Sequence, residues 1–397
     1  MRLLHTSDWH LGHSLHGVGR DREHAAFLAW LADTVVREAC DALLVTGDVF
    51  DGSNPPAEAE RMWFGFLADV RARRPGLDVV VIAGNHDSPA RLGAAAPLLG
   101  AHGVRVVTGT ADPAAAVVEL AGAVVAAVPF LRPMDLPRDA DPTDAVRTVY
   151  GAVLAEARAR RGGRPLVATG HLFVTGCTPS ILSERRIISG GQEAVPVEVF
   201  SDDLAYVALG HLHRAQRVGG REHVRYAGSP IPLATAEADY RHQVVIADLH
   251  GDAPAAVRTI DVPRTVEVIR VPRHGAATVD EVVAALAALP GLDPDEDPAL
   301  RPYLEVAVAL ARPEPRLRAQ IEDAVAGKRP RLVKITATHT GDGRALADAV
   351  AGVALADLDP RDVFARRWQR DHEAAPSPAL LAAFDALVDE VRAGGAR

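Results

Sequence analysis

Several residue types that would assign this chain of 397 residues to a particular class are scarce. Its two cysteines, Cys40 and Cys177, cannot form a disulfide framework, and the sequence contains no C-x-x-C motif. No apolar run approaches the roughly 20 residues that a membrane-spanning helix requires, and the first residues lack the apolar stretch of a secretion signal. We therefore expect a cytoplasmic protein with reduced thiols.

Basic charge is also in short supply. The chain has 43 Lys and Arg residues against 52 Asp and Glu residues, which gives a formal net charge of -9. Such a balance does not hold a protein to nucleic acid through its overall field, so any action on DNA must depend on a local patch, bound metal ions or a partner. The only lysines, Lys328 and Lys334, are not followed by the Ser or Thr that a P-loop requires, which excludes ATP coupling by that route.

The apolar content is ample, at 48% of residues, and the chain exceeds the roughly 250–300 residues that a single core supports. Changes in composition predict four parts, namely an α/β domain over residues 1–263, a small domain over 264–340, a linker over 341–358 and a helical tail over 359–397. The small domain reads as β-α-β-α-β, and Thr278 with Glu281 forms a capping box at the start of its first helix. The tail reads as two helices, which begin near Pro360 and Pro378.

One local sequence pattern recurs in the first 250 residues. A short aliphatic run, typical of a buried strand, is followed at once by Gly or Thr and then by polar residues. The runs cover residues 3–5, 42–45, 79–83, 166–168 and 206–209. Helical patterns lie between the early runs, which predicts βαβ units, a largely parallel sheet, and two sheets packed face to face with helices outside. Because open α/β sheets bind ligands at the carboxyl ends of their strands, we expect the polar clusters to converge.

The polar clusters contain the side chains that bind divalent metal ions. Asp8 and His10 are two residues apart, as are His211 and His213, so each pair points to one side of an extended chain. Carboxylate, amide oxygen and imidazole together suit Mn²⁺, Fe²⁺ or Zn²⁺. Seven residues can hold two ions if one carboxylate bridges them, and two ions stabilise in-line attack on phosphorus. The candidate ligands are Asp8, His10, Asp48, Asn85, His171, His211 and His213.

In order, the clusters read D-x-H, G-D-x-x-D, G-N-H-D, G-H and G-H-x-H. This set resembles the motifs of the calcineurin-like metallophosphoesterases. The resemblance implies a two-sheet sandwich flanked by helices, with 264–340 as a capping domain. It further implies that Asp48 bridges two metal ions, the first also held by Asp8, His10 and His213 and the second by Asn85, His171 and His211. His86 would then assist departure of the leaving oxygen, and Asp87 would orient its ring.

Longer stretches are similar to the SbcD family of bacterial nuclease subunits, namely residues 4–12, 47–51, 83–88, 129–133, 208–216 and 228–233. This likeness implies a Mn²⁺-dependent DNA nuclease with 3′-5′ exonuclease activity on duplex ends and endonuclease activity on single strands and hairpins. It implies a homodimer that works with an SbcC-type ATPase in end processing, repair and recombination, with the tail docked on that ATPase. Asp51 is a departure from archaeal and eukaryotic relatives, which often have a histidine there.

Other interpretations compete with these assignments. Asp87 could cap a turn, and the apolar face of the last helix could fold back on residues 359–370. Trp9 and Trp63 are more typical of packing than of base stacking, and the face that includes Trp63 could be core or a subunit interface. Arg132 and the pair Arg185 and Arg186 could contact DNA backbone, or they could be solvated or salt-bridged. We expect the remaining histidines to be solvated; they include His13, His16, His24, His102, His223 and His242.

Two further functions fit the same motifs. One is a small-molecule phosphodiesterase or protein phosphatase, for which the second domain and the tail would be unnecessary. The other is a scaffold that has lost its metal ions, which the presence of all seven candidate ligands and His86 argues against. Cleavage of DNA would indicate a nuclease, whereas activity on a nitrophenyl ester alone would indicate a small-molecule phosphodiesterase or phosphatase. A chain that binds no metal would indicate the scaffold.

Overall fold

The computed structural model describes residues 1–137, 139–179, 194–312, 314–339, 360–372 and 375–394. The expected linker over 341–358 and the pair Arg185 and Arg186 lie outside these residues. By its contacts the chain divides into two compact units, Met1–Ala309 with Glu314–Thr338, and Leu310–Pro313 with His339–Arg397. The boundary expected at residue 263 falls inside the first unit and stays a prediction. No helix in the described residues is long and apolar enough to cross a membrane.

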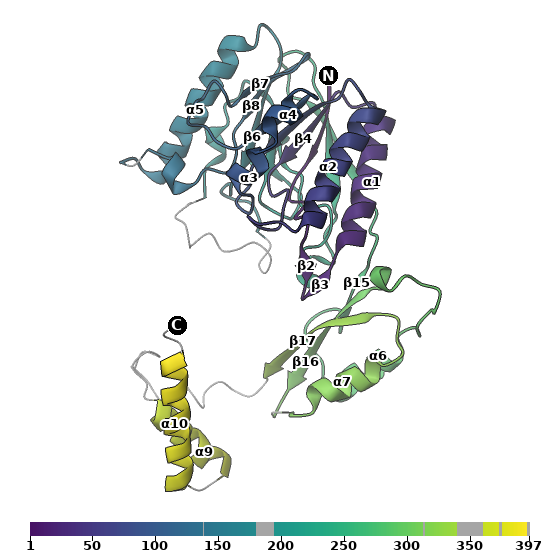
Figure 1. Ribbon diagram of the computed structural model, residues 1–397, viewed down its shortest axis with the longest axis vertical. Helices are drawn as coiled ribbons and strands as arrows, with labels where there is room; N and C mark the ends of the chain where they lie inside the picture. The colour runs from purple at the N-terminus through teal and green to yellow at the C-terminus, as the bar shows by residue number, and fades with distance from the viewer. Residues whose placement is uncertain (138, 180–193, 313, 340–359, 373–374, 395–397) are drawn as a thin grey trace. The chain divides into compact units, whose positions relative to one another are not determined.

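Two six-stranded sheets form most of the first unit (Figure 1). The first sheet has the order β14 (Ala256–Asp261), β13 (Gln243–Asp248), β1 (Arg2–Thr6), β4 (Ala42–Thr46), β5 (Asp78–Ile82) and β6 (Val104–Val107). The second has the order β11 (Gln216–Val218), β12 (Arg221–Tyr226), β10 (Leu204–Gly210), β9 (Leu166–His171), β8 (Val124–Ala127) and β7 (Val117–Glu119). In the first sheet β1, β4, β5 and β6 pair in parallel, and β13 pairs antiparallel with β1 and β14. In the second sheet β12, β10, β9 and β8 pair in parallel, and β11 and β7 pair antiparallel at the edges. The largely parallel pairing agrees with the sequence prediction.

The central strands are buried on both faces because each sheet is covered twice. Leu44 of β4 and Val80 of β5 pack into one core with Ala126 of β8 and Val167 of β9, so this core lies between the sheets. On the other face of the first sheet, α1 (Asp21–Arg37) and α2 (Ala57–Arg73) form a second core. The helix α5 (Pro142–Arg160), which the sequence reading did not identify, covers the second sheet (Figure 1). Continuous aliphatic runs are typical of strands buried in this way.

Trp9 and Trp63 belong to the core between α1, α2 and the first sheet. Trp9 is fully buried and its ring makes edge contacts with Phe27, Trp63 and Phe66. Leu67 and Val70 of α2 are also buried there. The packing interpretation of both tryptophans is therefore confirmed, and this face of α2 is not an exposed subunit interface.

The expected β-α-β-α-β unit is present in the order β15 (Val268–Val271), α6 (Val279–Ala287), β16 (Tyr303–Leu310), α7 (Leu317–Val325) and β17 (Arg331–His339). The three strands form one sheet in sequence order, and β15 and β16 are parallel. Thr278 and Glu281 form the capping box of α6. A hairpin of β2 (Ser14–Leu15) and β3 (Val18–Gly19) contacts this unit through an apolar cluster that contains Leu15, Val266 and Tyr303.

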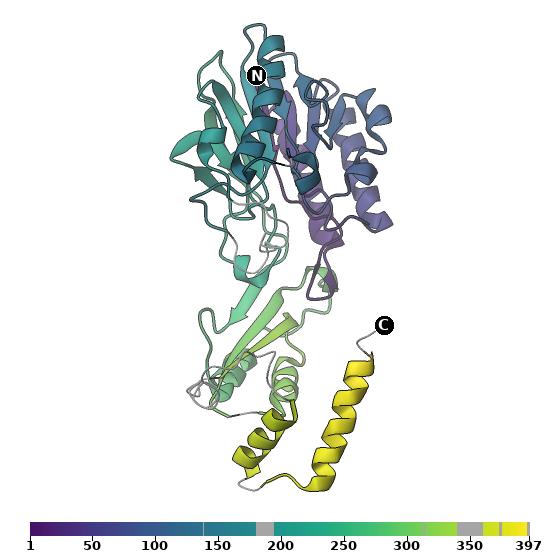
Figure 2. The ribbon, with the colours of Figure 1, turned by 90° about the vertical axis from the view of Figure 1, so that its left-hand side faces the viewer.

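Short helical segments complete the first unit: α3 (Pro89–Gly93), α4 (Ala96–Gly100), η1 (Pro133–Asp135), η2 (Val197–Val199), η3 (Thr235–Glu237) and η4 (Pro298–Leu300). In the second unit, α9 (Pro360–His372) and α10 (Pro378–Gly394) lie side by side (Figure 2). The rings of Phe364 and Phe384 stack with centroids 4.2 Å apart. The last helix thus folds back on α9, in agreement with the competing interpretation, although Leu387 is 56% exposed.

Candidate metal centre

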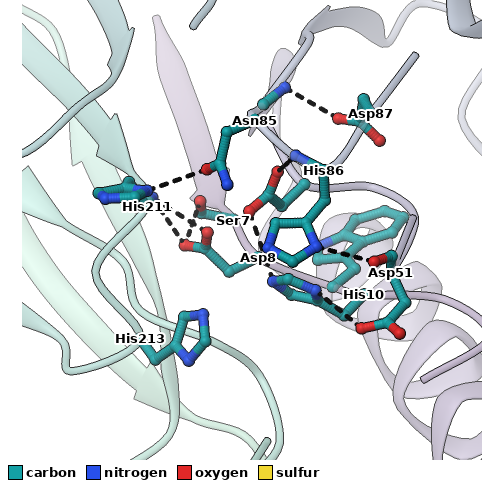
Figure 3. Close-up of polar contacts among 12 residues, drawn as sticks. Ser7, Asp8, His10, Asp51, Asn85, His86, Asp87, His211 and His213 are labelled. Carbon is teal, nitrogen blue, oxygen red and sulfur yellow. Dashed lines mark hydrogen bonds and ion pairs between the residues drawn. The ribbon is translucent and has the colours of Figure 1, made fainter. Parts of the chain in front are cut away.

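The five polar clusters meet at the carboxyl ends of strands from both sheets. Asp8 follows β1, Asp48 follows β4, Asn85 follows β5, His171 ends β9 and His211 follows β10. The side chains of Asp8, Asn85 and His211 lie close together (Figure 3). His171 Nε2 lies near both Asn85 Oδ1 and Asp48 Oδ2. The convergence expected from strand ends therefore occurs, and it joins two sheets rather than one.

The backbone at these positions is strained. Asp8, His10, Asp48 and His211 have φ angles of 54°, 48°, 49° and 101°, a range that residues other than glycine seldom adopt. Such conformations cost about 1–3 kcal/mol each and cluster at functional sites. They change the direction of the chain just after the strand ends, where the polar clusters lie.

Two glycines allow the clusters to approach each other closely. Gly47 has a φ of 90°, and a Cβ at this position would overlap the ring of His171. A Cβ at Gly84 would overlap the carboxylate of Asp48. Glycine is therefore required at both positions, because any side chain would overlap a candidate ligand. At Gly47 the positive φ is a second reason.

One group of candidate ligands contains Asp8, His10 and His213. One ligand atom from each lies within 4.8 Å of the others, and all three side chains are buried. His10 Nε2 is buried with no hydrogen-bond partner in the described residues, and it lies 3.5 Å from Asp48 Oδ2. Because an unpaired buried nitrogen is costly, this atom has the surroundings of a metal ligand.

A second group surrounds Asn85. Its Oδ1 atom lies 2.9 Å from His171 Nε2 and 3.0 Å from His211 Nδ1. The other ring nitrogen of His171 donates a hydrogen bond to the Thr46 carbonyl at 2.8 Å, which fixes the ring. Asp48 Oδ2 lies 3.3 Å from His171 Nε2, so this carboxylate contacts both groups of candidate ligands.

The electrostatics of the site fit divalent cations. Asp8 and Asp48 are buried, and no ion pair or hydrogen bond found among the described residues joins either carboxylate to a lysine or arginine. Burial opposes ionisation of Asp48, but the neighbouring His171 holds the pKa of Asp48 well below its usual value. Burial would lower the pKa of His171, yet the Asp48 carboxylate raises it to about 9. The residues present thus require positive charge, which a metal ion supplies.

His86 and Asp87 do not interact as the resemblance implied. His86 Nδ1 lies 2.7 Å from the carbonyl oxygen of Asp51, and within the described part of the chain no contact joins the ring to the Asp87 carboxylate. The Asp87 carboxylate instead accepts the backbone N–H groups of Val49, Phe50 and Gly84 at 3.2, 3.0 and 2.9 Å. The orienting role is therefore wrong for the side chain of Asp87, which fixes the backbone of two clusters. Burial raises its pKa to about 6.

Sequence reasoning missed two carboxylates that contact candidate ligands. Asp51 Oδ1 lies 3.2 Å from His10 Nδ1, and Glu237 Oε1 lies 3.0 Å from His213 Nδ1. Asp51 is the second Asp of G-D-x-x-D, so a signal for it was present. Glu237 lies 24 residues from His213 and has no motif at its position.

Two histidines that were expected to be solvated, His24 and His242, are buried. His24 is fully buried and its Nε2 lies 3.0 Å from the Trp9 carbonyl, and His242 is 7% exposed with Nδ1 2.8 Å from the Ser229 carbonyl. Neither is solvated. His13 and His16 line a cleft of about 260 Å³ together with His10, His86 and His213. Arg132 donates to the Asp87 carbonyl at 3.1 Å, so its guanidinium has a structural partner.

Comparison with known proteins agrees with this geometry. The model of the calcineurin-like phosphoesterase family matches residues 1–215. A second family model, described as the type 5 capsule protein repressor C-terminal domain, matches residues 262–372. The first match contains all seven candidate ligands but ends before β11, and the second covers the β-α-β-α-β unit and the first tail helix.

Curated relatives are named as the D subunit of the nuclease SbcCD. The protein of Rhodobacter capsulatus is 41% identical over 370 residues, which cover 87% of this chain and 90% of the relative. That of Escherichia coli K12 is 38% identical over 281 residues, or 67% of this chain and 69% of the relative. The protein of Bacillus subtilis 168 is 38% identical over 262 residues, which cover 62% of this chain and 66% of the relative. The chain therefore belongs to the calcineurin-like phosphoesterases and, within them, to the SbcD family of nuclease subunits, metal-dependent hydrolases of phosphodiester bonds.

Proposed function

We propose that this protein is a Mn²⁺-dependent DNA nuclease that cleaves duplex ends with 3′-5′ exonuclease activity and cuts single strands and hairpins as an endonuclease. The observation that carries the proposal is the contact of one buried carboxylate with two groups of ligands. Asp48 Oδ2 lies 3.5 Å from His10 Nε2 and 3.3 Å from His171 Nε2. A carboxylate in this position can bridge two divalent ions.

The proposed ligands of the first ion are Asp8, His10, His213 and the bridging Asp48. Those of the second ion are Asn85, His171, His211 and the same Asp48. When bound, two ions would stabilise the attacking and leaving oxygens of an in-line displacement at phosphorus and would lower the pKa of a bound water. Mixed oxygen and imidazole ligands suit Mn²⁺, which is the metal we propose.

His86 is proposed to act on the leaving oxygen. Its Nδ1 faces the Asp51 carbonyl, which can only accept a hydrogen bond, so Nδ1 must carry a hydrogen. Proton exchange with a substrate would then occur at Nε2. His86 also lies beside His10, with ring centroids 4.7 Å apart, and both line the cleft. Geometry alone permits a ligand role as well, because His10, Asp48 and His86 form a further group with ligand atoms within 4.8 Å.

The partner is proposed to be an SbcC-type ATPase, with this chain as a homodimer within a heterotetramer in the cytoplasm. The names of the curated relatives support this proposal, since each name describes one component of the SbcCD nuclease. The chain has a net charge of -9 and no P-loop, so both ATP hydrolysis and additional DNA-binding charge must come from elsewhere.

The experiment that tests the proposal uses purified full-length protein with blunt duplex and hairpin DNA, in Mn²⁺ and in EDTA, with and without the SbcC-type ATPase. A nitrophenyl phosphodiester serves as the small-molecule control. Cleavage of both DNA substrates in Mn²⁺, its loss in EDTA, and stimulation by ATP only with the partner are expected. Hydrolysis of the nitrophenyl ester without any DNA cleavage would identify a small-molecule phosphodiesterase instead.

A further inference from the structure

The segment of residues 228–238, here termed the strap, contacts the candidate ligand His213. Its Glu237 is fully buried and uses both carboxylate oxygens. Oε1 lies 3.0 Å from His213 Nδ1, and Oε2 accepts the N–H of Leu233 at 2.7 Å. The strap also donates the Ser229 N–H to the His213 carbonyl at 3.0 Å. One carboxylate thus joins the ring of His213 to the backbone of the strap.

The other side of the strap is held by a buried ion pair. The Arg20 guanidinium donates to the Pro232 carbonyl, and it also donates to both carboxylate oxygens of Glu23 at 2.8 and 2.7 Å. Both side chains are nearly inaccessible, at 1% and 2% exposure. A buried pair of this kind is stable only when its remaining donors and acceptors are satisfied, and the Pro232 carbonyl satisfies one of them.

The ion pair extends to the β-α-β-α-β unit. Tyr303, the first residue of β16, donates its hydroxyl to Glu23 Oε1 at 2.7 Å and is itself fully buried. The Arg20 guanidinium lies 5.6 Å from the Tyr303 ring centroid. A continuous set of buried polar contacts therefore runs from Tyr303 through Glu23 and Arg20 to Pro232, and from the adjoining Leu233 through Glu237 to His213.

We propose that Glu237 is a positioning residue that sets the tautomer of His213, and that the unit carrying Tyr303 holds Glu237 in place through the strap. A carboxylate opposite Nδ1 requires that Nδ1 carry the hydrogen, so a metal bound by His213 takes Nε2. Docking of the β-α-β-α-β unit then contributes to metal affinity at one of the two ions. This inference rests on the proposed assignment of His213 as a ligand.

Glu237→Gln is the direct test, because it keeps the size of the side chain and one acceptor. If the amide oxygen accepts the Leu233 N–H, the amide NH₂ faces His213 Nδ1 and favours the tautomer with hydrogen on Nε2. We expect Mn²⁺ affinity at one site to fall roughly 10- to 100-fold, while affinity at the other site and the melting temperature without metal stay the same. Calorimetric titration with Mn²⁺ measures both sites, and excess Mn²⁺ should restore nuclease activity.

The matched control is Glu222→Gln, which removes a carboxylate that contacts Arg217 and Arg225 away from the ligands. It should leave both Mn²⁺ affinities unchanged. Equal affinities in Glu237→Gln and wild type would overturn the positioning role. Uniform weakening at both sites with a lowered melting temperature would also overturn it, since that pattern indicates a structural role only.

The contribution of the β-α-β-α-β unit is tested with Tyr303→Phe, which removes only the hydroxyl donated to Glu23. We expect this change to weaken the same Mn²⁺ site by a factor of about 2 to 30, and to have little further effect when Glu237→Gln is already present. Additive effects in the double variant, or no effect of Tyr303→Phe, would refute the coupling.

His213→Ala separates this inference from the proposed ligand set. Loss of one Mn²⁺ site in His213→Ala together with unchanged binding in Glu237→Gln would contradict the positioning role alone. Unchanged Mn²⁺ binding in His213→Ala would contradict the ligand assignment itself, and the inference with it.

Discussion

The Nδ1 atom of His86 lies 2.7 Å from the backbone carbonyl oxygen of Asp51. This contact holds the ring beside the candidate ligands through a backbone acceptor rather than an acidic side chain. We expect His86→Ala to lower the nuclease rate roughly 10²- to 10⁴-fold, the usual size of a general-acid contribution, with unchanged metal content. Elemental analysis decides between the two roles, because a loss of bound metal in His86→Ala would make His86 a ligand.

Asp48 contacts both groups of candidate ligands. Asp48→Ala should therefore abolish activity on duplex, hairpin and single-stranded DNA alike, because both ions depend on the bridge. Rates on the three substrates and metal content should be measured on protein whose circular dichroism matches that of wild type. Retention of more than a few per cent of the wild-type rate would show that the two-metal arrangement is wrong.

Asp87 stabilises the fold of the site rather than the ring of His86. Asp87→Ala leaves three backbone N–H groups without their acceptor, which should lower the free energy of unfolding by roughly 2–4 kcal/mol. Urea denaturation measures the change. The control is Asp112→Ala, since the exposed Asp112 carboxylate accepts only the Ala114 N–H among the described contacts. Equal losses in the two variants would contradict the prediction.

We expect His5 to make the stability of the fold dependent on pH. Burial lowers the pKa of His5 to about 3, from 6.5 in the unfolded chain. Between these values the unfolded chain binds a proton that the folded protein does not, so stability falls as pH decreases from 6.5. The contribution is about 1.4 kcal/mol for each pH unit in this range.

Urea denaturation of metal-free protein at pH 6.5, 5.5 and 4.5 measures this dependence. His5→Gln, which can still contact Tyr206 and Thr46, should show a shallower fall in stability. His102→Gln replaces an exposed histidine in the same way. If both variants show the same slope against pH, His5 is not responsible.

The tail is expected to serve the partner and not the chemistry. Residues 339–397 belong to a separate compact unit, so deletion of residues 359–397 should leave Mn²⁺-dependent nuclease activity largely intact. ATP-stimulated degradation of duplex DNA with the SbcC-type ATPase should disappear. A truncated chain that still co-purifies with the ATPase and responds to ATP would disprove the role.

A point substitution on α10 tests whether the tail contacts the ATPase. Leu387 of α10 is 56% exposed, and Leu98 of α4 is 67% exposed. Leu387→Glu should weaken co-purification with the ATPase, because it places a charge on the apolar face of the tail, whereas Leu98→Glu should not.

The sequence by itself determined the central strands of the two sheets and the residues that meet at their ends. Leu44 and Val80 lie in continuous aliphatic runs, and strands buried on both faces require such runs. The strand periodicity and the glycines before Asp48 and Asn85 are local signals, so they are readable without knowledge of the fold. The capping box of Thr278 and Glu281 is local for the same reason.

Only the tertiary structure decided which groups hold these residues in place. Glu237 contacts a ring 24 residues away, and Tyr303 contacts a carboxylate 280 residues away. His24 looked solvated because its buried position depends on the loop that carries Trp9. Asp87 follows a candidate ligand, yet its carboxylate binds the backbone of Val49 and Phe50 from another strand end. A hydrogen bond between distant segments leaves no periodicity in the sequence, because its geometry exists only after the sheets have packed.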